Sequence, residues 1–287
     1  MYFLVYMMLR ELLKDKIPSN LLQYVPRSFD VIGSREKAVA IIEIPSELSG
    51  YEKIIAEGIM IIHRNVKSVL KKVGERKTEY RVREYELILG DPNTEVIHIE
   101  YGCKYLLDPM KVYFSPREST ERMRIVKKIY ENEFIMLMFA GICPYGIMIA
   151  KHKPDIKKIV AIEINPYAYN YMIKNIVLNK VQDKIIPVLG DVRNKAEKWY
   201  GMCDRVIMPL PKGAYLFLDE AFQCLKEEGG IIHFYHWGHE EDLFSNAIKI
   251  IEKYGKKYGR RIEILEKRKV LPYAPRVYKI RVDFKVF

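Results

Sequence analysis

Two neighbouring segments of the sequence carry residues that could bind a ligand. In the first, a glycine turn follows an apolar run, and in the second, an apolar run ends in an acidic residue. The run at residues 135–139 breaks into Ala140 and Gly141, and Pro144 follows before the apolar pattern resumes. Such a turn between a buried strand and a helix lets the backbone approach a ligand closely. About 20 residues later the next run ends in Glu163, where an acid can accept hydrogen bonds from ribose hydroxyls. The glycine turn and the acid together indicate a nucleoside cofactor, although an ordinary strand–turn–helix connection of an α/β protein has the same sequence pattern.

Two further apolar runs end in residues that suit the same ligand. Asp191 follows the run at 185–189, where it could accept a hydrogen bond from an adenine amino group or cap a helix. Pro209 and Pro211 follow the run at 205–208, where a turn would expose backbone carbonyls beside a reacting atom or simply end the strand. Four consecutive strand ends thus carry residues that suit a ligand, in the order that a cofactor-binding sheet requires, and this favours the functional interpretation.

The elements that must hold these residues alternate between strands and helices. A helix is predicted at 120–130, and the predicted strands of this region are 135–139, 159–163, 185–189, 205–208, 231–235, 261–267 and 277–287. This alternation predicts an α/β fold with a parallel, doubly wound sheet that binds ligands at the carboxyl ends of its strands.

The first hundred residues follow a different pattern. Helices are predicted at 8–14 and 51–62, and strands at 38–44, 67–72, 78–89, 96–100 and 104–107. We therefore expect a small α/β (α+β) domain at residues 1–107 and a Rossmann-like domain at residues 108–287.

The charge balance favours a polyanionic partner. The 287 residues include 48 Lys and Arg against 37 Asp and Glu, for a formal net charge of +11, and basic residues recur along the whole chain. RNA suits such a surface, although a lysine-rich composition alone gives the same charge. The densest basic segment contains Arg64, Lys67, Lys71, Lys72, Arg76 and Lys77. We expect it to contact RNA phosphates, with a solvated surface as the alternative.

The cysteines and the apolar stretches point to a reducing compartment. Cys103, Cys143, Cys203 and Cys224 form no CxxC pair and no cluster with zinc spacing, so no metal site is implied. The apolar start lacks a basic leader and a small-residue cleavage site, and no apolar run is long enough to span a membrane. We expect a cytoplasmic protein.

Together these motifs resemble one family. The specific part is Tyr113-Phe114-Ser115-Pro116-Arg117 followed by Thr120-Glu121-Arg122, and further matches are Met138–Gly141, Glu163–Pro166, Gly190–Arg193, Asp204–Met208 and Tyr273–Arg276. The sequence resembles the archaeal and eukaryal class I S-adenosylmethionine-dependent tRNA (guanine-37-N1) methyltransferases, and it is similar to their wyosine-pathway relatives. The resemblance covers nearly the whole chain, since it begins at Ile17-Pro18 and Val25–Gly33 and passes through Arg81.

The resemblance implies a class I methyltransferase domain at 108–287, a tRNA-contacting domain at 1–107, and a chain that acts as a monomer on the anticodon loop. The implied contacts of S-adenosylmethionine are Tyr113, Phe139, Ala140, Gly141, Pro144, Glu163, Ile164, Asp191, Val192 and Pro209. Those of the guanine are Phe114, Arg117, Arg122 and Arg193.

The implied catalytic residues are Glu121, Arg117, Arg81, Pro209 and Pro211. Guanine N1 carries a proton that must leave while charge builds on O6, and a carboxylate base with an arginine facing O6 meets both demands. Glu121 with Arg117 or Arg81 could supply them. The alternative is a solvated charge cluster on a helix surface, worth little to stability.

Three positions depart from the family pattern. The family has Asp where Met138 stands, Gly where Cys143 stands and Asn where Pro209 stands. These differences remove a hydrogen-bond acceptor, tighten the turn and remove an amide that would position the guanine. The Pro-x-Pro form resembles the branch that also methylates carbon 7 of the wyosine intermediate 4-demethylwyosine. The family's additional N-terminal domain, which contacts the outer corner of the tRNA, is expected to be absent.

Two alternatives remain beside methyl transfer to guanosine-37. One is transfer of the aminocarboxypropyl group of the same cofactor, as in a sister family of the wyosine pathway. The other is a non-catalytic RNA-binding protein on the same fold, suggested by Met138, Cys143 and Pro209. Joint retention of four residues argues against the second, namely Glu163, Asp191, Arg117 and Glu121.

Overall fold

The structure is a computed structural model that describes residues 2–74 and 83–287. The chain divides into two compact units, Met1–Pro116 and Arg117–Phe287, which are described separately. The division falls after Pro116, a few residues beyond the predicted boundary. Phe114 explains the difference, because its ring contacts His98 and Tyr105 of the first unit at centroid distances of 5.0 and 5.8 Å.

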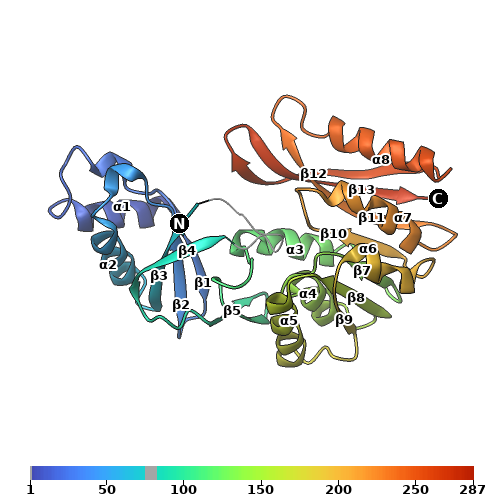
Figure 1. The fold of residues 1–287 in the computed structure, drawn as a ribbon, viewed down its shortest axis with the longest axis horizontal. Helices are drawn as coiled ribbons and strands as arrows, with labels where there is room; N and C mark the ends of the chain where they lie inside the picture. The colour runs from blue at the N-terminus through green and yellow to red at the C-terminus, as the bar shows by residue number, and fades with distance from the viewer. Residues whose placement is uncertain (1, 75–82) are drawn as a thin grey trace. The chain divides into compact units, whose positions relative to one another are not determined.

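In its described residues, the first unit contains a four-stranded sheet, two α-helices and a separate hairpin (Figure 1). Its elements are α1 Tyr2–Leu13, β1 Asp30–Gly33, β2 Ala38–Ile42, α2 Glu52–Ile62, β3 Val66–Val73, β4 Glu84–Gly90, β5 Val96–Glu100 and β6 Cys103–Leu107. The strand order is β1-β2-β3-β4, in which β2 and β3 are parallel and α2 forms the crossover between them. The predicted strand at 78–89 begins at Glu84 within the described part, and 75–82 lie outside it.

The second unit carries the alternating elements that the sequence predicts. They are α3 Ser119–Val126, β7 Phe134–Leu137, α4 Pro144–His152, β8 Lys158–Glu163, α5 Pro166–Leu178, β9 Ile185–Leu189, α6 Val192–Lys195, β10 Arg205–Met208, α7 Leu218–Cys224, β11 Gly230–His239, α8 Ser245–Lys257, β12 Ile262–Ala274 and β13 Val277–Val286. Short 3₁₀ turns, η3 Pro116–Glu118 and η5 Ala214–Phe217, lie before α3 and α7.

These strands form one seven-stranded sheet in the order β12-β13-β11-β10-β7-β8-β9. The five strands from β11 to β9 are parallel, as predicted, whereas β13 runs antiparallel to both β11 and β12. The tail strands differ because a short turn joins β12 to β13, and a tight turn allows only antiparallel pairing. The chain leaves β7 on one side for β8 and returns on the other as β10, so a topological switch point lies between β7 and β10.

Burial explains why the central strands read as continuous apolar runs. All four residues of β7 and all four of β10 are buried, since helices cover both faces of a parallel sheet (Figure 1). The core of this unit includes Met136, Val206 and Phe234.

The first helix of the second unit is shorter than predicted. The sequence indicates a helix at 120–130, but α3 ends at Val126, and the following amides of Lys128 and Ile129 bond to carbonyls three residues earlier. These tighter turns end the helix and redirect the chain into β7. Among the described residues, no helix combines the length and apolarity that crossing a membrane requires.

Candidate active site

The turn between β7 and α4 is built from three left-handed residues. Phe139, Gly141 and Cys143 have φ values of 55, 58 and 66°. Nothing lies within 4 Å of the position that a Cβ of Gly141 would occupy, so the backbone faces open space there. A Cβ on Gly146 would come within 2.5 Å of the Cys143 sulfur, so Gly146 makes room for the cysteine. Pro144 is the first helical residue of α4.

Glu163 ties this turn to the neighbouring strand. One carboxylate oxygen, Oε2, accepts from the Gly141 amide at 2.6 Å, and Oε1 accepts from the Asn165 amide at 2.7 Å. The side chain is buried, and burial raises the pKa of Glu163 above its ordinary value. A carboxylate offers about four acceptor sites, so two backbone amides leave capacity for a ribose hydroxyl.

Asp191 caps α6, and an aromatic cluster lies beside it. Its Oδ1 accepts from the Arg193 amide at 2.9 Å, which confirms the helix-capping role that the sequence left open. The Arg193 guanidinium lies 4.4 Å from the ring centre of Phe217, and that ring meets Phe139 edge-on at 4.8 Å. The carboxyl ends of β7 and β9 thus share a surface that can cover a purine.

The turn after β10 is shaped by its first proline. The amide of Leu210 donates to the Met208 carbonyl at 2.8 Å, which closes a three-residue turn centred on Pro209. The Met208 carbonyl is therefore engaged within the turn. Pro209 and Pro211, at the carboxyl edge of the sheet, are both partly exposed.

Glu121 is a buried carboxylate with defined partners. Its Oε1 accepts from the Tyr235 hydroxyl at 2.8 Å and forms an ion pair with Arg281. Its Oε2 forms an ion pair with Arg124 at 3.2 Å. Since Arg281 is wholly buried and Arg124 is 39% exposed, the two oxygens differ in how easily their partners can leave. The alternative of a solvated surface cluster is wrong for Glu121 and for Arg122, which is also buried.

The two tyrosines near Glu121 form a short hydrogen-bonded chain. The hydroxyl of Tyr145, in the first turn of α4, donates to Tyr235 at 3.3 Å, and Tyr235 donates to Glu121. Burial raises the pKa of both phenols well above the ordinary value, so both remain protonated donors.

A buried ion network continues from Arg281 into the sheet. Arg281 pairs with Asp283 at 2.7 Å, and Asp283 contacts Nδ1 of His233 at 2.7 Å. His233 contacts Arg205, which forms a bidentate pair with Glu133 at 2.6 and 2.7 Å. Because each member is buried and paired, the network holds β10, β11 and β13 in register beside Glu121.

The remaining predicted residues fall into three groups. Tyr113, which is exposed, and Phe114 belong to the first unit, whereas exposed Arg117 and buried Arg122 belong to the second. Ile164 and Val192 directly follow Glu163 and Asp191. Arg81 lies outside the described residues.

The predicted basic segment of the first unit is only partly available to a ligand. Arg64 and Lys67 are exposed, whereas Lys71 pairs with Glu52 at 3.0 Å and Lys72 with Glu43 at 3.7 Å. The last two residues of the segment, 76 and 77, lie outside the described part of the chain.

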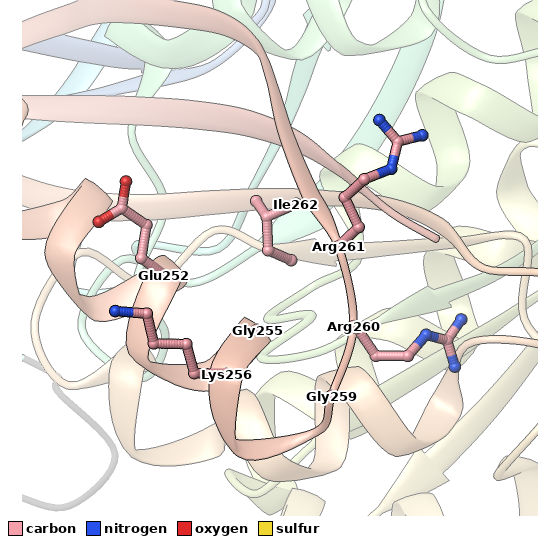
Figure 2. Close-up of a pocket in the computed structure, with 7 residues that line it drawn as sticks. All are labelled: Glu252, Gly255, Lys256, Gly259, Arg260, Arg261 and Ile262. Carbon is pink, nitrogen blue, oxygen red and sulfur yellow. The ribbon is translucent and has the colours of Figure 1, made fainter.

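A separate cavity of about 580 Å³ opens between the end of α8 and the start of β12 (Figure 2). Figure 2 shows the side chains of Arg260 and Arg261, just before β12, both extending away from α8, and Nε of Arg260 donates to the Phe287 carbonyl at 2.6 Å. Ile262 of this cavity pairs with Val286, as does Gly230, the first residue of β11. The cavity therefore lies at the amino edge of the sheet, away from the glycine turn.

The sequence reasoning missed Tyr235, Arg281 and Arg124. Tyr235 could have been found, because it directly follows the β11 segment paired with β10, in the same position as the other four strand ends. Arg281 carries a weaker signal, a charge within the apolar alternation of β13.

The sheet order, the glycine turn at the switch point and the acids at the next two strand ends define a class I methyltransferase domain. The chain belongs to the TRM5/TYW2 methyltransferase family. The TRM5/TYW2 methyltransferase domain matches residues 96–265, and the TYW2 N-terminal domain matches residues 9–94.

Known proteins of this family are similar over most of the chain. The tRNA (guanine(37)-N(1))-methyltransferase Trm5b of Pyrococcus abyssi is 44% identical over 94% of this chain and 78% of its own length. The tRNA (guanine(37)-N(1))/4-demethylwyosine(37)-methyltransferase Taw22 of Nanoarchaeum equitans is 31% identical over 89% of this chain and 98% of its own length. The solved complex of aTrm5 and tRNALeu is 40% identical, with a TM-score of 0.83, over 97% of this chain and 78% of that chain.

Proposed function

We propose that this chain transfers the methyl group of S-adenosylmethionine to N1 of guanosine-37 in tRNA. The observation that carries the proposal is the buried carboxylate of Glu121, held by Tyr235 and Arg281. The similarity to Trm5b and to the complex of aTrm5 with tRNALeu supports the same reaction and tRNA as the substrate.

The residues at the switch point suit S-adenosylmethionine. The open backbone at Gly141 admits the cofactor, with Ala140 and Pro144 beside it. Glu163 accepts from the ribose hydroxyls with its remaining acceptor capacity. When bound, the sulfonium supplies an electrophilic methyl group. Tyr113 and Pro209 complete this set in the proposal.

The adenine would lie at the neighbouring strand ends. Asp191 accepts from the adenine amino group, while Ile164, Val192 and Phe139 provide apolar contact. Arg193 would contact the substrate in the proposal. Its guanidinium also packs against the ring of Phe217.

Glu121 would act as the general base. Its Oε1 is already occupied by the hydrogen bond from Tyr235 and the ion pair with Arg281. The N1 proton would therefore go to Oε2, after the partly exposed Arg124 moves away from that oxygen. The N1 electron pair then forms the bond to the methyl carbon, the carbon–sulfur bond breaks, and S-adenosylhomocysteine leaves. Arg117 or Arg81 stabilises the charge that builds on O6.

The guanine would be held by residues of the segment around η3. In the proposal Phe114 stacks against the base, and Arg122 contributes a fixed positive charge near it. Arg117 is exposed and can move toward O6.

We propose a second methylation, at carbon 7 of 4-demethylwyosine, in the same site. Pro209 and Pro211 support it, because they replace the amide side chain that would hold guanine with a rigid turn closed by the Leu210 amide. The similarity to Taw22, whose name includes both activities, supports the same assignment.

We also propose roles for the rest of the chain. Residues 1–107 contact the tRNA, with Arg64 and Lys67 on its phosphates. Residues 108–287 carry the cofactor and the chemistry. The enzyme acts as a monomer in the cytoplasm, where its tRNA substrate is modified.

A base substitution in the RNA tests the proposed reaction. Methyl-labelled S-adenosylmethionine is incubated with the protein and with two transcripts that carry guanosine or adenosine at position 37. Label in the first transcript alone supports the proposal, since adenosine lacks both the N1 proton and O6. Equal labelling of both transcripts would place the reaction elsewhere on the RNA.

A further inference from the structure

Strands β11, β12 and β13 extend beyond the carboxyl edge of the parallel sheet (Figure 1). Pairing between β10 and β11 ends at Met208 and Phe234, whereas β11 continues to His239, which pairs with Val277 of β13. The extension is therefore three-stranded and antiparallel. It projects past the edge where the Pro209 turn and the end of β7 lie.

The extension carries an exposed aromatic pair. The rings of Tyr273, on β12, and Trp237, on β11, lie 4.1 Å apart with an interplanar angle of 32°. Tyr273 is 58% exposed although Trp237 covers part of it, so a large part of its surface is available for contact. An exposed aromatic ring supported from behind by a second ring is suited to stack an unpaired nucleobase.

Cationic side chains are frequent on the strand that carries Tyr273 and in the turn that follows it. The segment from residue 267 to residue 280 contains five basic residues and no acid. Lys267, Arg268 and Lys269 are exposed, and Lys269 lies 3.3 Å from the ring centre of Tyr278. The nearest acids are engaged, since Glu266 pairs with Arg268 and the pair Glu240 and Glu241 with Arg276. The lysines are available to phosphates directly. Arg276 would exchange its exposed partners Glu240 and Glu241 for a phosphate, because exposed ion pairs contribute little to stability.

Arg276 occupies a backbone conformation that favours glycine. Its φ is 61° in the turn between β12 and β13, and its carbonyl accepts from the Glu240 amide at 2.8 Å. Its side chain is 57% exposed at the tip of the extension. A bulky residue held in the left-handed region costs stability, so an arginine there fits a role in contacting a ligand.

We infer that this extension is an RNA-docking surface, on which Tyr273 stacks a nucleobase next to the one being modified while Lys267, Lys269 and Arg276 contact the flanking phosphates. The inference rests on the proposed function for the identity of the RNA. The occupant is tRNA, because the surface continues from the edge that carries the Pro209 turn and combines stacking with positive charge.

Affinity for tRNA tests the inference. Binding of an unmodified transcript with guanosine at position 37 is measured by fluorescence anisotropy for the wild type, Tyr273→Leu and Tyr130→Leu. Tyr130 is a matched control, being 67% exposed just before the amino end of β7. We expect Tyr273→Leu to weaken binding about tenfold and Tyr130→Leu to leave it unchanged, with cofactor binding by calorimetry equal in all three.

Arg276→Gly separates a binding role from a folding role. Glycine relieves the left-handed backbone, so the melting temperature is expected to hold or rise while tRNA affinity falls several-fold and its dependence on salt weakens. Unchanged affinity in both Tyr273→Leu and Arg276→Gly would overturn the inference.

The proposed function fails in a different way. Absence of 1-methylguanosine with the wild type would reject the reaction while Tyr273-dependent RNA binding remained. Normal methylation by a Tyr273→Leu protein of unaltered affinity would reject the docking surface alone.

Discussion

The hydroxyl of Tyr235 donates a 2.8 Å hydrogen bond to Oε1 of Glu121, and Arg281 holds the same oxygen. One carboxylate oxygen is thus fixed from the sheet, and the other faces an arginine that solvent can reach. For a general base this division matters, because the fixed oxygen sets the direction in which the other oxygen points.

Tyr235→Phe is expected to lower kcat about tenfold and to leave KM for tRNA and for the cofactor near the wild-type values. The phenyl ring keeps the packing and removes only the hydroxyl. Arg281 is a poorer target, because removing one partner of a buried ion pair costs about 3–5 kcal/mol of stability. Steady-state kinetics of methyl transfer give both parameters.

Tyr145→Phe is the matched control for this prediction. It removes the hydroxyl that donates to Tyr235 at 3.3 Å and leaves the contact between Tyr235 and Glu121 in place. Equal losses of kcat in the two variants would mean that the hydroxyls matter only for packing.

Glu163→Gln is expected to weaken binding of S-adenosylmethionine about tenfold or more, because the amide presents an N–H group where Gly141 or Asn165 needs an acceptor. Calorimetry of the free protein measures the change. Glu252→Gln, at the separate cavity, should bind the cofactor as the wild type does. Wild-type affinity in the Glu163 variant would remove the acid from the cofactor site.

Pro209→Asn is expected to raise methylation of guanosine-37 and to reduce methylation of 4-demethylwyosine. The amide can hold guanine by hydrogen bonds, and the rigid turn closed by Leu210 is lost. Parallel assays on tRNA with either base at position 37 give the ratio of the two rates. A ratio equal to that of the wild type would show that Pro209 does not select between the bases.

His233 is expected to contribute to a fall in stability between pH 7 and pH 5. Burial lowers the pKa of His233 below its ordinary value of 6.5, so the folded protein keeps a neutral imidazole that the unfolded chain protonates. Urea unfolding of His233→Gln should show about 1 kcal/mol less dependence on pH over this range.

The chosen range isolates the histidine from its neighbour. Burial acts against the charge of Asp283, but the hydrogen bond from His233 and the cations Arg281 and Lys128 hold the pKa of Asp283 below its ordinary value of 3.8. Its contribution is present above that value and is lost only in stronger acid. The same pH dependence in wild type and variant would assign the effect to another group.

The strand ends could be predicted because their signals are local. Gly141, Glu163 and Asp191 each follow an apolar run that only a buried strand explains, and the parallel sheet brings such ends to one edge. The helix cap at Asp191 was also visible in the sequence. The antiparallel direction of β13 is harder to predict from the sequence, because it depends on the length of the connection between β12 and β13.

The buried environment of Glu121 could not be predicted, because its partners Tyr235 and Arg281 lie 114 and 160 positions away. Sequence periodicity reports which residues share a face of one element, but it does not report which faces meet. The sequence of α3 alone is therefore equally compatible with a solvated charge cluster, and it is the contacts from Arg281 and Tyr235 that bury Glu121.

The identity of the product tests the account most directly. Unmodified tRNA with guanosine at position 37 is incubated with the protein and methyl-labelled S-adenosylmethionine, and its nucleosides are separated by mass spectrometry beside a Glu121→Gln sample. The account predicts label in 1-methylguanosine and a loss of about a hundredfold or more in the variant. Label in another nucleoside, an aminocarboxypropyl adduct without methyl label, or equal yield from Glu121→Gln would contradict it.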